Sequence, residues 1–223
     1  MPHKDFRPLM KNCKALTYRL VLAVCLFVIS PLAMSAIAHE IRPAVADLSM
    51  TSAPLPANNK ALHDQLFITI DLNAELFLAG LDASFVRDTD DAPQGKDYDA
   101  LRALTADQLA QKFTNQWPNF EKALTGIADD RPLSFQLDSI QVEDNPAITL
   151  PRSSKIKISA PLNPNDASVR FGWNAALGPL VIRQQNQTEK PENLYTAYLE
   201  PGEISASIKR HGVTAQPVFT VML

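Results

Sequence analysis

The sequence has little cysteine. Cys13 and Cys25 are the only two, and both lie near the N-terminus, in a stretch with the features of a removable leader. The chain that remains after cleavage is therefore expected to contain no cysteine. Such a chain has no disulfide and no thiol nucleophile, so a packed core must stabilise it.

The sequence also lacks the motifs of common enzyme classes. It contains no G-x-S-x-G, no H-E-x-x-H and no glycine-rich phosphate loop after a strand. Two pairs of adjacent carboxylates, Asp90-Asp91 and Asp129-Asp130, stand beside turn-forming residues, as solvated loop acids do, and do not favour a glycosidase. The stretch DTDDAP, from Asp88 to Pro93, lacks the spaced ligands of an EF-hand. These absences predict a protein that is not an enzyme.

No apolar run reaches the roughly 20 residues that a membrane-spanning helix needs. The apolar run from Leu20 to Met34 follows a basic segment and precedes the small residues Ala36 and Ala38. This order is typical of a secretory signal peptide, so we expect residues 1–38 to be removed by cleavage after Ala38 and the protein to be periplasmic. Translation starts at Met1 or Met10. Val24, before Cys25, is not the small residue of a lipobox, so no lipid anchor is expected.

Residues 39–223 are expected to form a single exported domain. The leader removes five basic residues and one acid, which leaves 16 basic and 23 acidic residues and a net charge of −7. An acidic balance argues against nucleic acid or anionic lipid as a partner. It is compatible with attraction of cations, but also with solubility alone.

Alternating apolar and polar residues predict several half-buried strands, joined by connections rich in proline and asparagine. The alternating apolar sets begin at Ala46, Leu66, Leu133, Ile156, Val169 and Ile204. From Tyr98 to Leu124 the apolar spacing is instead helical, with a capping box formed by Thr105 and Gln108. Pro118 is expected to break or kink this helix, and Gly126 to end it. We predict a mainly β protein, an immunoglobulin-like antiparallel β-sandwich with a helical insertion around residues 98–124.

His39 would be the first residue after cleavage. The α-amine and the imidazole of an N-terminal histidine can close a chelate ring on one metal ion, and nitrogen ligands in a near-planar arrangement suit Cu(II) or Ni(II). Glu40 can supply an oxygen, and His63 or His211 can complete the site if the fold brings either close. The alternative is that His39 is solvated and only marks the cleavage site.

Four stretches resemble the exported region of the HupE/UreJ family, the hydrogenase and urease accessory membrane proteins. They are AHEIRPAVADLSM, DTDDAPQGKDYDALRALTADQL, VRFGWNAALGPLVIRQQ and LYTAYLEPGEIS, and together they span most of residues 39–223. The resemblance implies a role in uptake of nickel or another divalent metal. It also places His39, Glu40, Arg42 and Pro43 at the start of the exported domain.

In that family a polytopic membrane region follows the exported domain. Here the sequence given stops at Leu223, after GVTAQPVFTVML, where the first spanning helix would begin. The permease activity therefore cannot be carried over, and we expect a membrane transporter or a separately encoded membrane half as partner. That partner would hold the domain at the inner membrane.

Three functions remain open. The first is an accessory domain that binds a divalent metal, Ni or Cu, through His39, Glu40 and His63. The second is a structural or interaction domain that docks on a membrane partner and has no metal role. The third, a copper oxidative enzyme with an N-terminal histidine brace, needs a second histidine on the same face, and no spacing shows one. Arg42 and Arg183 are each expected to pair with a buried acid, and Trp173 to lie in the core.

Overall fold

The computed structural model describes residues 42–51, 64–86, 88–144, 151–186, 190 and 194–210. The backbone divides into two units, Met1–Ala38 and His39–Leu223, and every described residue belongs to the second. The predicted leader lies outside the described residues. So do all four histidines of the sequence and Glu40.

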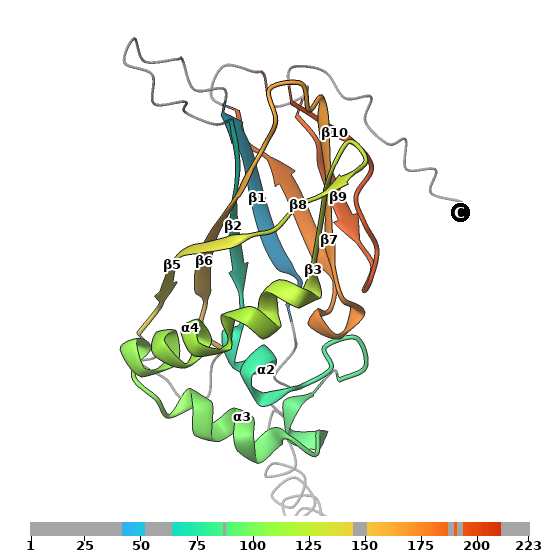
Figure 1. Cartoon of the computed structure of the whole chain (residues 1–223). Coiled ribbons are helices and arrows are strands. Elements are labelled where there is room, and N and C mark those ends of the chain that lie inside the picture. The colour runs from blue at the N-terminus through green and yellow to red at the C-terminus, as the bar shows by residue number, and fades with distance from the viewer. Residues whose placement is uncertain are drawn as a thin grey trace, which may run out of the picture. The chain divides into compact units, whose positions relative to one another are not determined.

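The protein is mainly β, with one sheet of six strands and one of four (Figure 1). The six-stranded sheet has the order β5-β6-β2-β1-β8-β9. Its strands are β1 Ala44–Thr51, β2 Gln65–Leu72, β5 Gln136–Val142, β6 Ser154–Pro161, β8 Leu180–Gln184 and β9 Thr196–Leu199. All neighbours pair antiparallel except β1 and β8, which are parallel. The sheet is therefore mixed, and the prediction of a purely antiparallel fold is wrong at this pair.

The four-stranded sheet is antiparallel throughout and has the order β10-β7-β3-β4. Its strands are β3 Leu124–Ala128, β4 Arg131–Pro132, β7 Ser168–Trp173 and β10 Ile208–Lys209. Short β4 and β10 form its two edges.

The registers of the six-stranded sheet place apolar residues in rows across one face. One row runs through paired residues of five neighbouring strands: Ile156, Ile70, Ala46, Ile182 and Ala197. All are buried, and they belong to one core that also contains buried residues of β3, β7, β10 and helix α4. The alternation seen in the sequence thus becomes a single apolar face because strand side chains point alternately to the two faces.

Three α-helices gather at the end of the six-stranded sheet where β1 begins and β2 ends (Figure 1). They are α2 Ala74–Ala79, α3 Gly95–Arg102 and α4 Ala106–Ala123, and two 3-10 turns accompany them, η2 Thr89–Asp91 and η3 Ala175–Leu177. Helix α4 buries Leu109, Phe113 and Phe120, and the rings of Phe113 and Phe120 contact Phe77 of α2 edge to face. Phe113 and Phe120 thus belong to the core.

The sequence predicted strands β1, β2, β6 and β7 correctly but did not predict β3, β4, β8 and β9. The Thr105–Gln108 capping box is confirmed, and Trp173 is buried. The helical insertion divides into α3 and α4, and α4 continues through Pro118 to Ala123, so of the predicted break or kink the break is wrong. Gly126 lies in strand β3 and does not end a helix. Helix α2 was not predicted.

Two predicted strands are displaced. Residues 133–135 form a connection, because Leu133 N donates to Gly126 O and Phe135 N to the Glu121 carboxylate, and strand β5 starts only at Gln136. Near the C-terminal end, Ser205 is buried and its hydroxyl accepts from Phe171 N, whereas Ile204 is 43% exposed. The alternation predicted from Ile204 is therefore out of phase, and the strand there is only β10.

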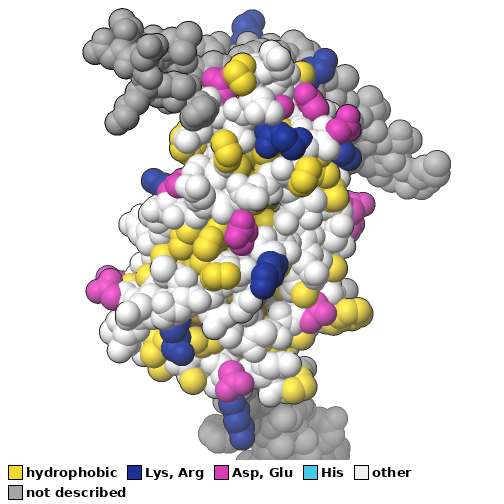
Figure 2. Space-filling view, viewed as in Figure 1, with side chains coloured by type: hydrophobic (Ala, Val, Ile, Leu, Met, Phe, Trp, Pro, Cys, Tyr) yellow, Lys and Arg dark blue, Asp and Glu magenta, His cyan; other side chains and the backbone are white. Residues whose placement is uncertain are grey.

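The surface carries charges of both signs. On the face shown in Figure 2, acidic and basic side chains are interspersed and no wide area has a single sign. In the part of the chain that the structure describes, no helix has the length and apolar character to span a membrane.

Candidate functional site

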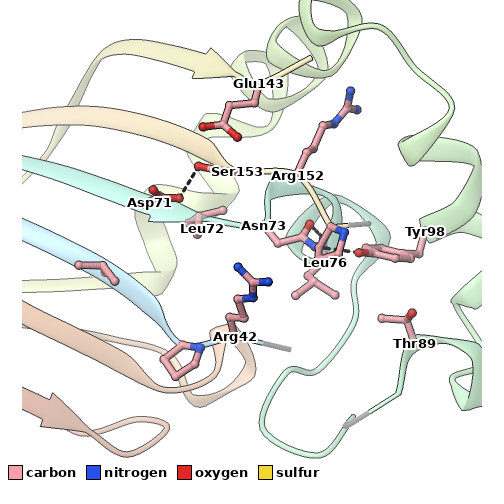
Figure 3. Close-up of a pocket in the computed structure, with 13 residues that line it drawn as sticks. Arg42, Asp71, Leu72, Asn73, Leu76, Thr89, Tyr98, Glu143, Arg152 and Ser153 are labelled. Atoms are coloured by element: carbon pink, nitrogen blue, oxygen red, sulfur yellow. Dashed lines mark hydrogen bonds between the residues drawn. The ribbon is translucent and has the colours of Figure 1, made fainter. Parts of the chain in front are cut away.

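The described residues contain a cavity of about 330 Å³ at the end of the six-stranded sheet where the helices gather (Figure 3). The strand registers bring its walls together. Val45 of β1 pairs with Asp71 of β2, so Arg42, which precedes β1, lies beside the residues that end β2. Leu72 of β2 pairs with Ser154 of β6, which brings the connection between β5 and β6 to the same place.

Arg42 lies at the exposed rim of this cavity. Figure 3 shows its guanidinium on one side of the space and the carboxylates of Asp71 and Glu143 on the other. Among the described residues, the Arg42 side chain forms no hydrogen bond or ion pair. The expected pairing of Arg42 with a buried acid is therefore not found in this part of the chain.

Each of the two carboxylates of the cavity accepts at most one hydrogen bond from a described residue. Asp71 accepts a hydrogen bond from the Ser153 hydroxyl at 2.5 Å. Glu143 is exposed, and only its backbone is held, by the bond from its N–H to Ser153 O at 3.0 Å. Neither forms an ion pair with a described residue, which leaves both available to a cation or a cationic group.

Asn73 and Tyr98 form a fixed polar wall. The Asn73 side-chain oxygen caps α2 by accepting from Leu76 N, and its amide donates to the Tyr98 hydroxyl at 2.8 Å. Burial raises the pKa of Tyr98, although the bond from Asn73 and the charge of Arg102 lower it in part. The Tyr98 phenol therefore stays protonated near neutral pH, and its position is set by α2 and α3 together.

Arg152 lines the cavity, but its charged guanidinium bonds to residues outside it. Its guanidinium points away from Arg42 (Figure 3) and bonds to Glu75 at 2.6 Å and to the carbonyl oxygens of Leu104 and Leu101. Burial raises the pKa of Glu75, an effect that bonding to its own backbone, Arg152 and Arg102 partly offsets. This buried pair holds the helices against the sheet and adds no free charge to the cavity.

Two acidic stretches singled out in the sequence have structural roles. The Asp129 carboxylate, in the turn between β3 and β4, accepts from Ala167 N and from the backbone and hydroxyl of Ser168. Asp88 caps η2 through Asp90 N. Arg183 does pair with an acid, Asp47, at 2.7 Å, but the pair is exposed rather than buried. None of these residues lines the cavity.

The predicted metal residues His39, Glu40 and His63 lie outside the described residues, as does His211. Within the described ranges, no group of three or more His, Cys, Asp or Glu is placed to hold a metal ion. Asp71, Asn73, Tyr98 and Glu143 were not singled out from the sequence. The one signal for them was Asn73 as a helix N-cap directly after a strand.

Asp64 and Arg210 are the sequence neighbours of His63 and His211, and the structure describes both. Asp64 and Arg210 form an ion pair with each other, next to the start of β2. Because β1 and β2 are antiparallel strands of eight residues, this pair lies at the end of the sheet opposite to Arg42, a strand length of roughly 25 Å away. Comparison of the chain with protein-family models and with curated proteins finds no match for it.

Proposed function

We propose that the protein is the exported accessory domain of a HupE/UreJ-like uptake system and binds a divalent metal, Ni or Cu, through His39 at its mature N-terminus. The role is binding, with no catalysis, in the periplasm. The metal would then pass to a membrane transporter or to a separately encoded membrane half of the system.

One observation carries this proposal: the chain next to His39 enters the fold at a cavity with two available carboxylates. His39 is three residues before Arg42, and an extended chain advances at most about 3.6 Å per residue. Three residues of chain before Arg42 can therefore span at most about 11 Å. Asp71 and Glu143 line the same cavity as Arg42, so their oxygens are suited to supplement the His39 nitrogens and Glu40.

His63 receives no such support. Its neighbour Asp64 lies at the opposite end of β1 and β2 from Arg42. The role of His63 as a metal ligand stays a prediction, and the proposal rests on His39 and Glu40.

The two sheets also support a more specific fold. We infer an immunoglobulin-like sandwich because buried residues of both sheets belong to one core, with Trp173 of β7 among them. The parallel pair of β1 and β8, in the interior of the six-stranded sheet, is compatible with this because mixed sheets are common.

The metal proposal is tested by titrating Cu(II) and Ni(II) into two purified forms. One begins at His39, and the other carries a single glycine before His39, which moves the α-amine out of the chelate and keeps the imidazole. We expect the first form to bind at least tenfold tighter, about 1.4 kcal/mol. Equal binding, or none, would show that His39 only marks the cleavage site and would favour the interaction domain.

A second comparison tests the cavity carboxylates. The double variant Asp71→Asn/Glu143→Gln should weaken binding to the form that begins at His39. Asp138→Asn is a matched control, because Asp138 accepts a serine hydroxyl, that of Ser159, on the same sheet but outside the cavity. If both variants bind metal as the parent does, the carboxylates take no part in the site.

A further inference from the structure

The cavity carries charges of both signs that do not neutralise one another. Arg42 is on one side, and Asp71 and Glu143 are on the other (Figure 3). None of the ion pairs of the described residues joins Arg42 to either carboxylate. Opposite charges that line one space and remain apart are suited to a ligand that carries both charges itself.

The other lining residues fit a small organic ligand. Leu72, Leu76 and Pro43 supply apolar surface, and the Asn73–Tyr98 bond fixes a polar wall between them. Ligand cavities combine such apolar walls with a few placed polar groups, and their volumes usually begin at about 300 Å³. A cavity of about 330 Å³ is at the small end of that range.

We propose that this cavity binds a small zwitterion of the α-amino acid class. The Arg42 guanidinium binds the ligand carboxylate through its fork of N–H donors, a geometry for which arginine is suited. Asp71 and Glu143 accept from the ligand ammonium. The ligand side chain lies against Leu72 and Leu76. This activity goes beyond the proposed metal binding and does not require it.

The test uses the form that begins at His39, stripped of metal with EDTA and kept in EDTA. Each of the twenty amino acids is screened by thermal shift, and those that raise the Tm are measured by calorimetry. For each of these, the N-acetyl derivative lacks the ammonium and the amide derivative lacks the carboxylate. We expect the parent amino acid to bind at least tenfold tighter than either derivative.

Variants of the protein assign each charge. Arg42→Gln should abolish the preference for the amino acid over its amide, which lacks the carboxylate. Asp71→Asn/Glu143→Gln should abolish the preference for the amino acid over its N-acetyl derivative, which lacks the ammonium. The controls are Arg170→Gln and Asp138→Asn, whose positions lie outside the cavity. They should bind as the parent does, and unchanged Tm values without ligand verify that all four variants fold.

Three results would overturn the proposal. They are no binding by any amino acid, equal binding of the amino acid and both derivatives, or binding that survives Arg42→Gln unchanged. Trialanine is a further arm, because its terminal charges lie farther apart. Tighter binding of trialanine than of every amino acid would assign the cavity to peptide termini and overturn the ligand class. Because EDTA is present throughout, failure here is distinguishable from failure of the metal titration.

Discussion

At the scale of single residues, Asp129 shows how one carboxylate can organise a turn. It has a positive φ of 48°, which aspartate and asparagine tolerate better than most residues. Three hydrogen bonds, from Ala167 N, Ser168 N and Ser168 Oγ, tie this turn to the start of β7. The same bonds hold the pKa of Asp129 below its ordinary value of 3.8, with the Ala167 N–H contributing most.

These bonds make a pH-dependent contribution to stability. A carboxylate whose pKa is lower in the folded state stabilises that state above the unfolded pKa, and the effect is lost as the pH falls through the folded pKa. We expect Asp129→Asn to lower the urea midpoint at pH 7 and the difference to shrink as the pH falls below 3.8. Asparagine keeps the backbone preference but loses the charge and one of the two acceptor oxygens.

The control for this series is Asp130→Asn, in the next position of the same turn, which is exposed. It should leave the midpoint nearly unchanged at each pH. A difference between wild type and Asp129→Asn that is constant from pH 7 to pH 3 would contradict the account, because the charge would then contribute nothing.

At the scale of elements, helix α4 contains a proline, Pro118, in its interior. Pro118 lies on an exposed part of the helix, and its nitrogen cannot donate to the carbonyl of Thr114. We expect Pro118→Ala to raise the free energy of unfolding by up to about 3 kcal/mol, the difference between the two residues in a helix interior. Urea unfolding followed by circular dichroism measures it.

Asn119→Ala, at the neighbouring exposed position, controls for any gain in stability that alanine gives in a helix in general. Asn119 bonds only to Gln116 of the same helix, so its replacement should change stability by well under 1 kcal/mol. A Pro118→Ala variant no more stable than wild type would indicate that the proline fits this helix without cost.

The elements also show what sequence patterns can and cannot predict. The strands at β1, β2, β6 and β7 were found because their inward residues alternate without interruption. The stretch after Ile204 was misassigned because Ser205 turns inward to satisfy Phe171 N, a need that exists only once β7 is in place. Helix α2, with six residues, is too short for helical periodicity to show.

The cavity was out of reach of the sequence for a similar reason. Arg42 was singled out in the sequence, but its proximity to Asp71 follows from the register of β1 and β2. Glu143 lies in the connection between β5 and β6, and the pairing of these strands brings it to the cavity. Three segments separated by many residues form one site. No spacing along the chain could show that.

At the scale of the whole molecule, one buried side chain joins the chain before β6 to helices α2 and α3 and to the connection between α3 and α4. Arg152 precedes β6 and bonds to Glu75 of α2, to Leu101 of α3 and to Leu104 before α4. Glu75 is fully buried and Arg152 is 3% exposed, so neither charge is compensated by water. The pair thus couples the packing of the helices to that of the sheet.

We expect Arg152→Met to lower the free energy of unfolding by roughly 3–5 kcal/mol, because it leaves the Glu75 carboxylate buried without its partner. The loss should be smaller below pH 4.5, where a protonated Glu75 needs no countercharge. The double variant Glu75→Leu/Arg152→Met should recover much of the loss.

Arg183→Met serves as the control, since the Arg183–Asp47 pair is exposed and should contribute no more than about 1 kcal/mol. If Arg152→Met costs no more than Arg183→Met in urea unfolding, the buried pair does not join the helices to the sheet.

The parallel pairing of β1 with β8 has a consequence for how the chain folds. Ala44 of β1 pairs with Leu180 of β8. The second edge of β1, an early strand, is therefore covered only when β8, a late strand, is in place. Contacts of such long sequence separation slow folding, because the closure entropy of the long loop opposes them. Until β8 is synthesised, β1 presents an unpaired edge, the kind of surface on which partly made chains aggregate and chaperones act.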